Sequence, residues 1–138
     1  MSSAGDAVPV DEVERVRAAN RAFYDAFESR DMDAMSELWE RSPRALCTHA
    51  GWGTLRGWAQ VAASFFALFQ GPRTQFLLTE ERVEVEGSLA WVTVDENLLG
   101  DGGGATVATL NLFAYDELAD AWRLVGHHGS PVSASVGS

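Results

Sequence analysis

The segment 122–131 has the sequence WRLVGHHGSP and is the last of four long strand-like stretches that decide the fold. It begins with an aromatic residue, alternates through apolar positions and then carries two histidines side by side. Successive side chains of a strand point to opposite faces, so we expect one of His127 and His128 to face inward and the other solvent. An inward imidazole at the end of a sheet is a candidate for a functional site.

Three further strand-like stretches precede this segment, and short turns join them. Residues 75–86 end in a clear alternation of valine with charged residues, and residues 89–99 follow the turn at Gly87-Ser88. Residues 105–115 come after a glycine-rich loop at 101–104, which we expect to be flexible. Long strands joined by short turns favour an antiparallel sheet.

Three amphipathic helices are predicted from apolar residues at helical spacing. The first begins at a capping box with Asp11 as N-cap and extends to about Ser29. Asp31 caps a shorter second helix, which Ser42-Pro43 ends, and a third helix covers residues 58–69. Three helices packed on one face of a curved antiparallel sheet give an α+β fold with a conical cavity.

The length of 138 residues fits one domain, which we place at residues 11–132. Residues 1–10 and 133–138 consist mainly of small or polar residues, so we expect both segments to be flexible. The N-terminus lacks the basic start and apolar core of a secretory signal, and no stretch of about 18 apolar residues occurs. We therefore expect a cytoplasmic protein with no membrane partner.

The charge of the chain excludes several classes of function. The formal net charge is −10, and an acidic surface argues against binding nucleic acid or anionic lipid. No lysine occurs, which excludes a Schiff base on a lysine side chain. The single cysteine, Cys47, excludes an internal disulfide and a multi-cysteine zinc site, and we expect it to be a small buried residue.

Four short motifs and the order of the elements resemble the NTF2-like superfamily, in particular its SnoaL-like and ketosteroid-isomerase-like branches. The motifs are SRDMD at 29–33, LRGW at 55–58, ATLNLF at 108–113, and WRLV at 122–125 with the histidines after it. The resemblance runs from about Val13 to Val132 and implies a cystatin-like roll. It also implies a homodimer formed through the exposed face of the sheet. The fold hosts isomerases, cyclases, dehydratases and non-catalytic proteins, so it does not select a reaction.

The resemblance can be followed to single residues. Ketosteroid isomerases use a carboxylate base before the third helix, with a tyrosine and a protonated aspartate as oxyanion donors. These positions fall on His49, Phe23 and Asn111, with Tyr24 on a different helical face from Phe23. The base thus becomes an imidazole and one donor is lost, so ordinary steroid isomerisation is not expected.

Four residues are candidates for acid–base chemistry. His49 could act as a general base, and Asn111 could donate to a developing oxyanion. If Val94 pairs with Asn111 and Tyr115 with Trp122, then Glu96, Thr109 and His128 form one row across three strands. The row fails if either hairpin slips by one residue. The alternatives are a loop-edge role for His49 and a solvated strand position for Glu96.

Several side chains could bind an apolar ligand, although a helical aromatic stripe is more often core. Trp52 is the strongest of them, because it lies in a glycine-flanked loop with no periodic reason to be buried. His49, His128 and Glu96 could supply metal ligands, but their pattern is weak, and we expect neither a metal nor a cofactor. The full set of expected ligand-binding residues is Phe23, Trp39, Trp52, Phe66, Thr109 and Phe113.

Two hypotheses for function follow. In the first, the protein binds a small, mostly apolar molecule in the cone, as an isomerase, cyclase or dehydratase in which His49 or His128 moves a proton. In the second, it is a non-catalytic ligand carrier or a dimeric interaction module on the same scaffold. An open polar cavity favours the first hypothesis, and a cone filled with aromatic side chains favours the second.

Overall fold

The computed structural model describes residues 10–100 and 104–133. Of the segments expected to be flexible, residues 1–9, 101–103 and 134–138 lie outside these ranges, and Val10 is the first residue of a helix. The described helices, none of which is long and apolar enough to cross a membrane, are α2 (Val10–Ser29), α3 (Met32–Leu38) and α4 (Trp58–Phe69). The described strands are β1 (Leu46–Thr48), β2 (Leu55–Arg56), β3 (Gln75–Glu86), β4 (Leu89–Leu99), β5 (Thr106–Asp116) and β6 (Ala121–Pro131).

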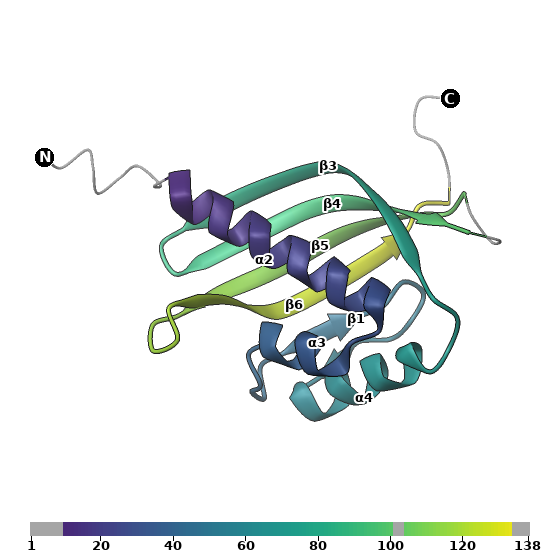
Figure 1. Cartoon of the computed structure of the whole chain (residues 1–138), viewed down its shortest axis with the longest axis horizontal. Coiled ribbons are helices and arrows are strands. Elements are labelled where there is room, and N and C mark those ends of the chain that lie inside the picture. The colour runs from purple at the N-terminus through teal and green to yellow at the C-terminus, as the bar shows by residue number, and fades with distance from the viewer. Residues whose placement is uncertain (1–9, 101–103, 134–138) are drawn as a thin grey trace, which may run out of the picture.

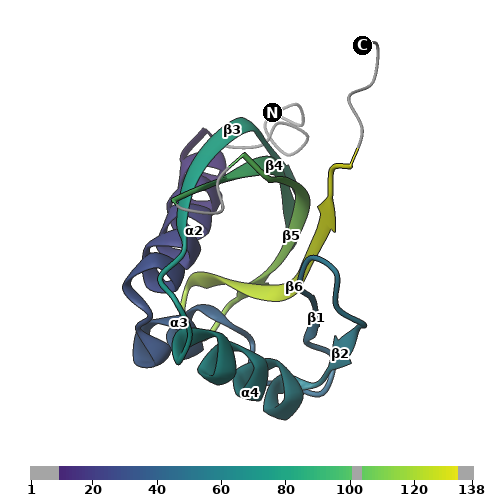
Figure 2. The ribbon, with the colours of Figure 1, turned by 90° about the vertical axis from the view of Figure 1, so that its right-hand side faces the viewer.

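The strands form one six-stranded sheet in the order β2-β1-β6-β5-β4-β3. All neighbours are antiparallel except β1 and β6, which pair in parallel. The sheet curves strongly, and the three helices lie on its concave side (Figures 1 and 2). The predicted α+β architecture, a curved sheet packed on three helices, is confirmed.

The core fills the space between the helices and the concave face of the sheet. Helix α2 buries Val16, Phe23 and Ala26 at helical spacing, and the sheet contributes alternate residues such as Val92 and Phe113. Burying a side chain of this size stabilises the fold by about 1.5–3 kcal/mol. Cys47, as expected, is fully buried here.

The second helix is shorter than expected. Asp31 caps it by accepting a hydrogen bond from the backbone N–H of Ala34 at 3.0 Å, as predicted. The helix ends at Leu38 rather than at Ser42, because Trp39 leaves it and forms a bridge to Leu124 on β6. The predicted N-cap of the first helix, Asp11, lies instead in its first turn.

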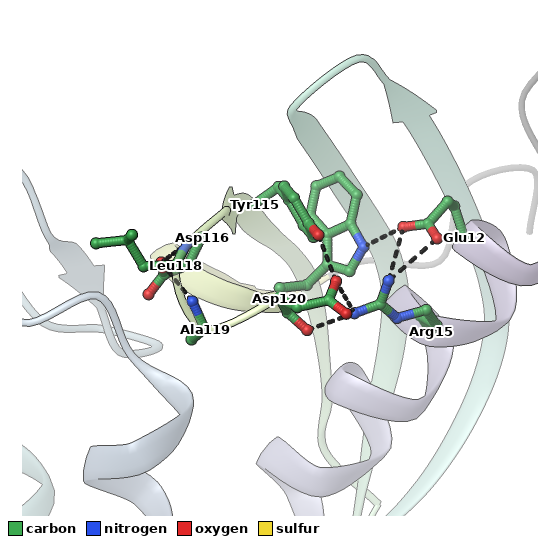
Figure 3. Close-up of polar contacts among 8 residues, drawn as sticks. Glu12, Arg15, Tyr115, Asp116, Leu118, Ala119 and Asp120 are labelled. Atoms are coloured by element: carbon green, nitrogen blue, oxygen red, sulfur yellow. Dashed lines mark hydrogen bonds and ion pairs between the residues drawn. The ribbon is translucent and has the colours of Figure 1, made fainter.

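A cluster of polar contacts joins the β5–β6 turn to the start of α2 (Figure 3). We call it the hairpin cluster, and it consists of Glu12, Arg15, Tyr115, Asp120 and Trp122. Asp120 accepts hydrogen bonds from the Tyr115 hydroxyl and from Arg15, the latter at 3.0 Å. The indole N–H of Trp122 donates to Glu12 at 2.9 Å. This cluster closes one end of the molecule.

Candidate functional site

A cavity of about 200 Å³ lies on the concave side of the sheet, between the C-terminal ends of α2 and α4 and strands β3 to β6. Its titratable side chains come from three separate segments, as His49, Glu96 and His127. The volume is below the ~300–1,000 Å³ of sites for drug-sized ligands, so the cavity suits a small molecule. Its lining residues are Phe27, His49, Ala50, Trp52, Leu68, Thr74, Phe76, Glu96, Leu98, Val107, His127 and Gly129.

The inward histidine of strand β6 is His127, which is 5% exposed, whereas His128 is exposed on the other face of the sheet. The cause is a bulge, in which β6 carries the extra residue Val125. The pairing of Thr109 with His128 that the sequence suggests is therefore wrong, because Thr109 pairs with Gly129. One inserted residue exchanges the faces of all side chains that follow it.

The register expected for the β4–β5 hairpin is also wrong, but by an even number of residues. Val94 pairs with Thr109 and not with Asn111. Because the displacement is two residues, the same side chains still face inward, and Glu96 is buried at 6% exposure. The predicted row of Glu96, Thr109 and His128 is not formed, and Glu96 shares the cavity with the other histidine of β6.

His49 lies beside His127, with 6.0 Å between the ring centroids, because β1 and β6 pair in parallel. Its Nε2 is 2.9 Å from Oγ of Ser64, whose hydroxyl donates to the carbonyl of Val61. The serine hydrogen is thus in use, and His49 donates to Ser64 through Nε2. Burial lowers the pKa of His49 to about 4 and that of His127 to about 3, so both imidazoles are neutral at pH 7.

Glu96 has the opposite shift. Burial raises its pKa, and hydrogen bonds with Tyr24 and Thr109 oppose this in part. The Tyr24 hydroxyl lies 2.5 Å from Oε2 of Glu96, to which it donates, and burial together with this carboxylate raises the pKa of the phenol. Tyr24 is the polar residue that the sequence missed: although it follows Phe23 on a different helical face, both side chains are buried, because α2 lies within the concave face.

Asn111 lies behind His127 and not in the cavity wall. Its Oδ1 is 2.6 Å from Nδ1 of His127, and its Nδ2 donates to Asn20 at 2.9 Å and to Tyr24 at 3.2 Å. The two amide hydrogens thus have partners inside the protein, and none remains for a ligand. We call Asn20, Tyr24, Glu96, Asn111 and His127 the buried network.

Of the six side chains expected to bind ligand, Trp52 is the one found among the described lining residues. It is 44% exposed at the rim, and its ring lies 4.9 Å from that of His49. The hydroxyl of Thr109 donates to the carbonyl of Val107 at 3.4 Å, and Phe66 is 59% exposed and lies outside the lining. The remaining three are core residues with at most 1% exposure: Phe23, Trp39 and Phe113.

The apolar wall of the cavity consists of residues that are not in the expected ligand-binding set. Phe27 lies one helical turn beyond Phe23, and Leu68 lies near the end of α4. Helical spacing predicts that such residues face inward, but it does not distinguish core from cavity wall. The other wall residues are Phe76, Leu98 and Val107.

The polar lining has no positive charge. No arginine is among the described lining residues, and the chain contains no lysine. Within residues 10–100 and 104–133, no three His, Cys, Asp or Glu side chains are placed to hold one metal ion. An anionic ligand would therefore lack a counter-charge in this cavity.

Comparison with solved structures gives several similar proteins. A candidate dehydratase of the NTF2-like family from Streptomyces avermitilis is 37% identical, with a TM-score of 0.83 over 92% of this chain and 100% of its own. A candidate association domain of a calcium/calmodulin-dependent protein kinase type II from Thiobacillus denitrificans is 32% identical, with a TM-score of 0.77 over 85% of this chain and 94% of its own. A cystatin-like fold protein from Burkholderia xenovorans is 20% identical, with a TM-score of 0.77 over 91% and 95%, and shares the fold.

Comparison with curated proteins gave no match. The model of the SnoaL-like domain matches residues 16–134, which is most of the chain. This match agrees with the curved sheet, the three helices and the internal cavity described above. The chain belongs to the SnoaL-like family of the NTF2-like superfamily.

Proposed function

We propose that this protein binds a small, uncharged, mostly apolar molecule in its cavity and removes water from it, as a dehydratase. The observation that carries the proposal is that Glu96, His49 and His127 line a single cavity of about 200 Å³. Burial raises the pKa of Glu96 and lowers the pKa values of His49 and His127. Titratable groups whose pKa values are displaced in opposite directions are suited to be a general acid and a general base.

His127 is the better placed of the two bases. His49 uses its Nε2 to donate to Ser64, while Nε2 of His127 has no hydrogen-bond partner among the described residues. Among the described residues, Nε1 of Trp39 is the one fully buried side-chain nitrogen or oxygen without a partner, so Nε2 of His127 is not fully enclosed. Because His127 is among the residues that line the cavity, its Nε2 is the nitrogen that we assign to the ligand.

The reaction that fits these roles is the elimination of water from a β-hydroxy carbonyl compound. His127 takes the proton from the carbon next to the carbonyl, and the electrons of that C–H bond form the new C=C bond. The C–O bond breaks, and the leaving hydroxyl takes the proton of Glu96 and departs as water. Return of a proton from His127 to Glu96 through water restores the starting state.

The low basicity of the imidazole narrows the substrate class. A base with a pKa of about 3 requires a C–H bond that a neighbouring group activates, because an unactivated C–H bond is far too weak an acid. A carbonyl group next to the C–H bond supplies this acidity, whereas an isolated alcohol does not. The name of the Streptomyces avermitilis relative, a candidate dehydratase, supports the same reaction class.

The test is a panel of small β-hydroxy ketones, followed by absorbance of the conjugated product. Glu96→Gln removes the acid, and His127→Asn keeps a donor toward Asn111 while it removes the basic nitrogen. Each should lower the rate by at least about 100-fold, as expected for loss of general acid–base catalysis. The matched control is His128→Gln, the neighbouring exposed histidine, which should keep the wild-type rate. Equal rates in Glu96→Gln and wild type would refute the proposal, and binding without turnover would identify a carrier.

We also propose that the outer face of the sheet pairs with a second copy of the chain. Leu46, Leu89 and Leu110 point outward from their strands and are 37–43% exposed. A hollow of about 250 Å³ lies among Leu46, Leu110, Leu112 and His128. Exposed apolar side chains on one face of the sheet favour coverage by a partner, and the Thiobacillus denitrificans relative is named as an association domain.

Light scattering after size exclusion tests this assembly. The wild type should be a dimer at micromolar concentration, and Leu110→Arg should give a monomer because it places a charge in the interface. Leu118→Arg, at a fully exposed position in the β5–β6 turn, is the matched control and should remain dimeric. A monomeric wild type would contradict the proposal.

A further inference from the structure

A line of hydrogen bonds joins His127 in the cavity to a carboxylate at the edge of the sheet. The carboxylate is Glu81, which lies in a bulge of β3, where two residues of β3 stand opposite one residue of β4. Its neighbour Glu80 has a φ of 57°, a conformation that L-residues rarely adopt. In this bulge Glu81 is directed toward α2 and contacts Asn20 and Arg17.

The line begins at the carboxylate of Glu81, which can only accept hydrogen bonds. Glu81 forms an ion pair with Arg17 at 3.3 Å, and its Oε2 is 3.0 Å from the amide of Asn20. A carboxylate has no hydrogen to give, so Asn20 must present its NH₂ group to Glu81. Its carbonyl oxygen then points to Asn111 and must accept from the NH₂ group of that residue at 2.9 Å.

The orientation of Asn111 in turn determines the proton position on His127. With its NH₂ group directed toward Asn20, Asn111 presents Oδ1 to Nδ1 of His127 at 2.6 Å. An amide oxygen cannot donate, so the hydrogen of this bond belongs to Nδ1. Tyr24 supports the same orientation, because it donates to Glu96 and accepts from Asn111 at 3.2 Å.

We propose that Glu81 is a positioning residue that acts through Asn20 and Asn111 to hold His127 with its hydrogen on Nδ1 and a lone pair on Nε2. The inference rests on the proposed function, since that lone pair faces the cavity as the base. It also defines the ligand: a group that faces His127 must offer hydrogen, and a group that faces Glu96 in its proposed role as the acid must accept it. A small uncharged hydroxy-carbonyl compound satisfies both requirements.

The tautomer can be measured directly in the free protein, without any substrate. Long-range ¹H–¹⁵N correlation spectra distinguish a protonated from a bare nitrogen in each imidazole, and the chain has just three histidines. His127→Asn removes one set of signals and so assigns His127. The expected result at pH 7 is a protonated Nδ1 and a bare Nε2 for His127, and the opposite for His49. A protonated Nε2 on His127 would overturn the inference.

Substitution of Glu81 tests the distant end of the line. Glu81→Leu removes the acceptor, so the amides of Asn20 and Asn111 become free to turn and the tautomer ratio of His127 should change by about tenfold. That change corresponds to about 1.4 kcal/mol, the size of one hydrogen bond. Glu81→Gln retains an acceptor oxygen and should restore the wild-type ratio, as should the matched control Glu84→Leu at an exposed position of the same strand.

An unchanged ratio in folded Glu81→Leu would refute the role of Glu81. If the leucine variant does not fold, the wild-type tautomer still tests the line of donors. The result is also separable from the proposed reaction. A dehydratase assay can fail while the tautomer is as expected, and the tautomer can differ while Glu96→Gln still abolishes turnover.

Discussion

The hairpin cluster and the buried network each contain a tyrosine that donates to a carboxyl group, yet the two carboxyl groups shift in opposite directions. In the hairpin cluster, the hydrogen bond from Tyr115 lowers the pKa of Asp120, which is exposed to water (Figure 3). In the buried network, the bond from Tyr24 also acts to lower the pKa of Glu96, but burial raises it by more.

The difference shows that the hydrogen bond alone does not decide the charge of the carboxyl group. Water stabilises Asp120 as an anion whether or not Tyr115 is present. Glu96 has lost that solvation, and one or two donors do not replace it. The same pairing of a tyrosine with a carboxyl group therefore favours the charged carboxylate at the hairpin, whereas burial disfavours it in the cavity wall.

The largest loss of stability is expected for Asn111→Ala, which removes the central amide of the buried network. It leaves Nδ1 of His127 and Oδ1 of Asn20 each without a partner, and the Tyr24 hydroxyl keeps only its bond to Glu96. Because each unpaired buried group costs about 1–3 kcal/mol, the free energy of unfolding should fall by about 4 kcal/mol. Urea denaturation measures it, and a loss as small as that of an exposed substitution would contradict the network.

The pH dependence of the free energy of unfolding tests the buried groups without any substitution. His49 and His127 have pKa values of about 4 and about 3 in the folded protein, against 6.5 for an ordinary histidine. The unfolded chain thus binds more protons below pH 6.5, and the free energy of unfolding falls as the pH falls. The contribution of Glu96 to this pH dependence has the opposite sign, because its pKa is raised on folding.

Between pH 6.5 and 4.5, each buried histidine should cost about 2 kcal/mol of stability. Urea denaturation at several pH values measures the slope. His127→Asn should remove about half of it, and the exposed control His128→Gln should leave it unchanged. A slope that is equal in His127→Asn and in the wild type would show that the imidazole of His127 is solvated.

The smallest effect is expected at the hairpin cluster. Asp120→Ala removes the contacts of Arg15 and Tyr115 with that side chain, but water can replace them, because exposed ion pairs contribute little. The melting temperature should stay close to that of the wild type, and 0.5 M salt should make the two proteins indistinguishable. A loss comparable to that of Asn111→Ala would show that the cluster is not an exposed one.

The sequence predicted the helices and strands of this fold better than it predicted how the strands pair. The bounds of α4, β3 and β4 follow from periodicity and turn residues, as does the cap at Asp31. Strand β2, with two residues, is too short to give a pattern, and its pairing with β1 depends on contacts across a loop. The parallel pairing of β1 with β6 was not predicted either, because it also depends on a contact between segments that a loop separates.

The candidate site was predicted in part, and the errors have local causes. Glu96, His49 and Trp52 line the cavity, but the bulge at Val125 exchanges the roles expected for the two histidines of β6. Gly126 is the one hint of this bulge in the sequence 122–131, because a glycine inside a strand often accompanies a bulge, but it does not show that the register shifts there. Which inward residues border a cavity depends on how the helix ends meet the sheet, and periodicity carries no such information.

The parallel contact between β1 and β6 also bears on how the protein reaches its native state. The two strands are far apart in the chain, so their pairing closes a long loop, which is slow relative to the formation of hairpins. The β3–β4, β4–β5 and β5–β6 hairpins can form from neighbouring segments before that contact exists. We therefore expect His49 and His127 to meet late in folding, so that the candidate site is among the last parts of the molecule to assemble.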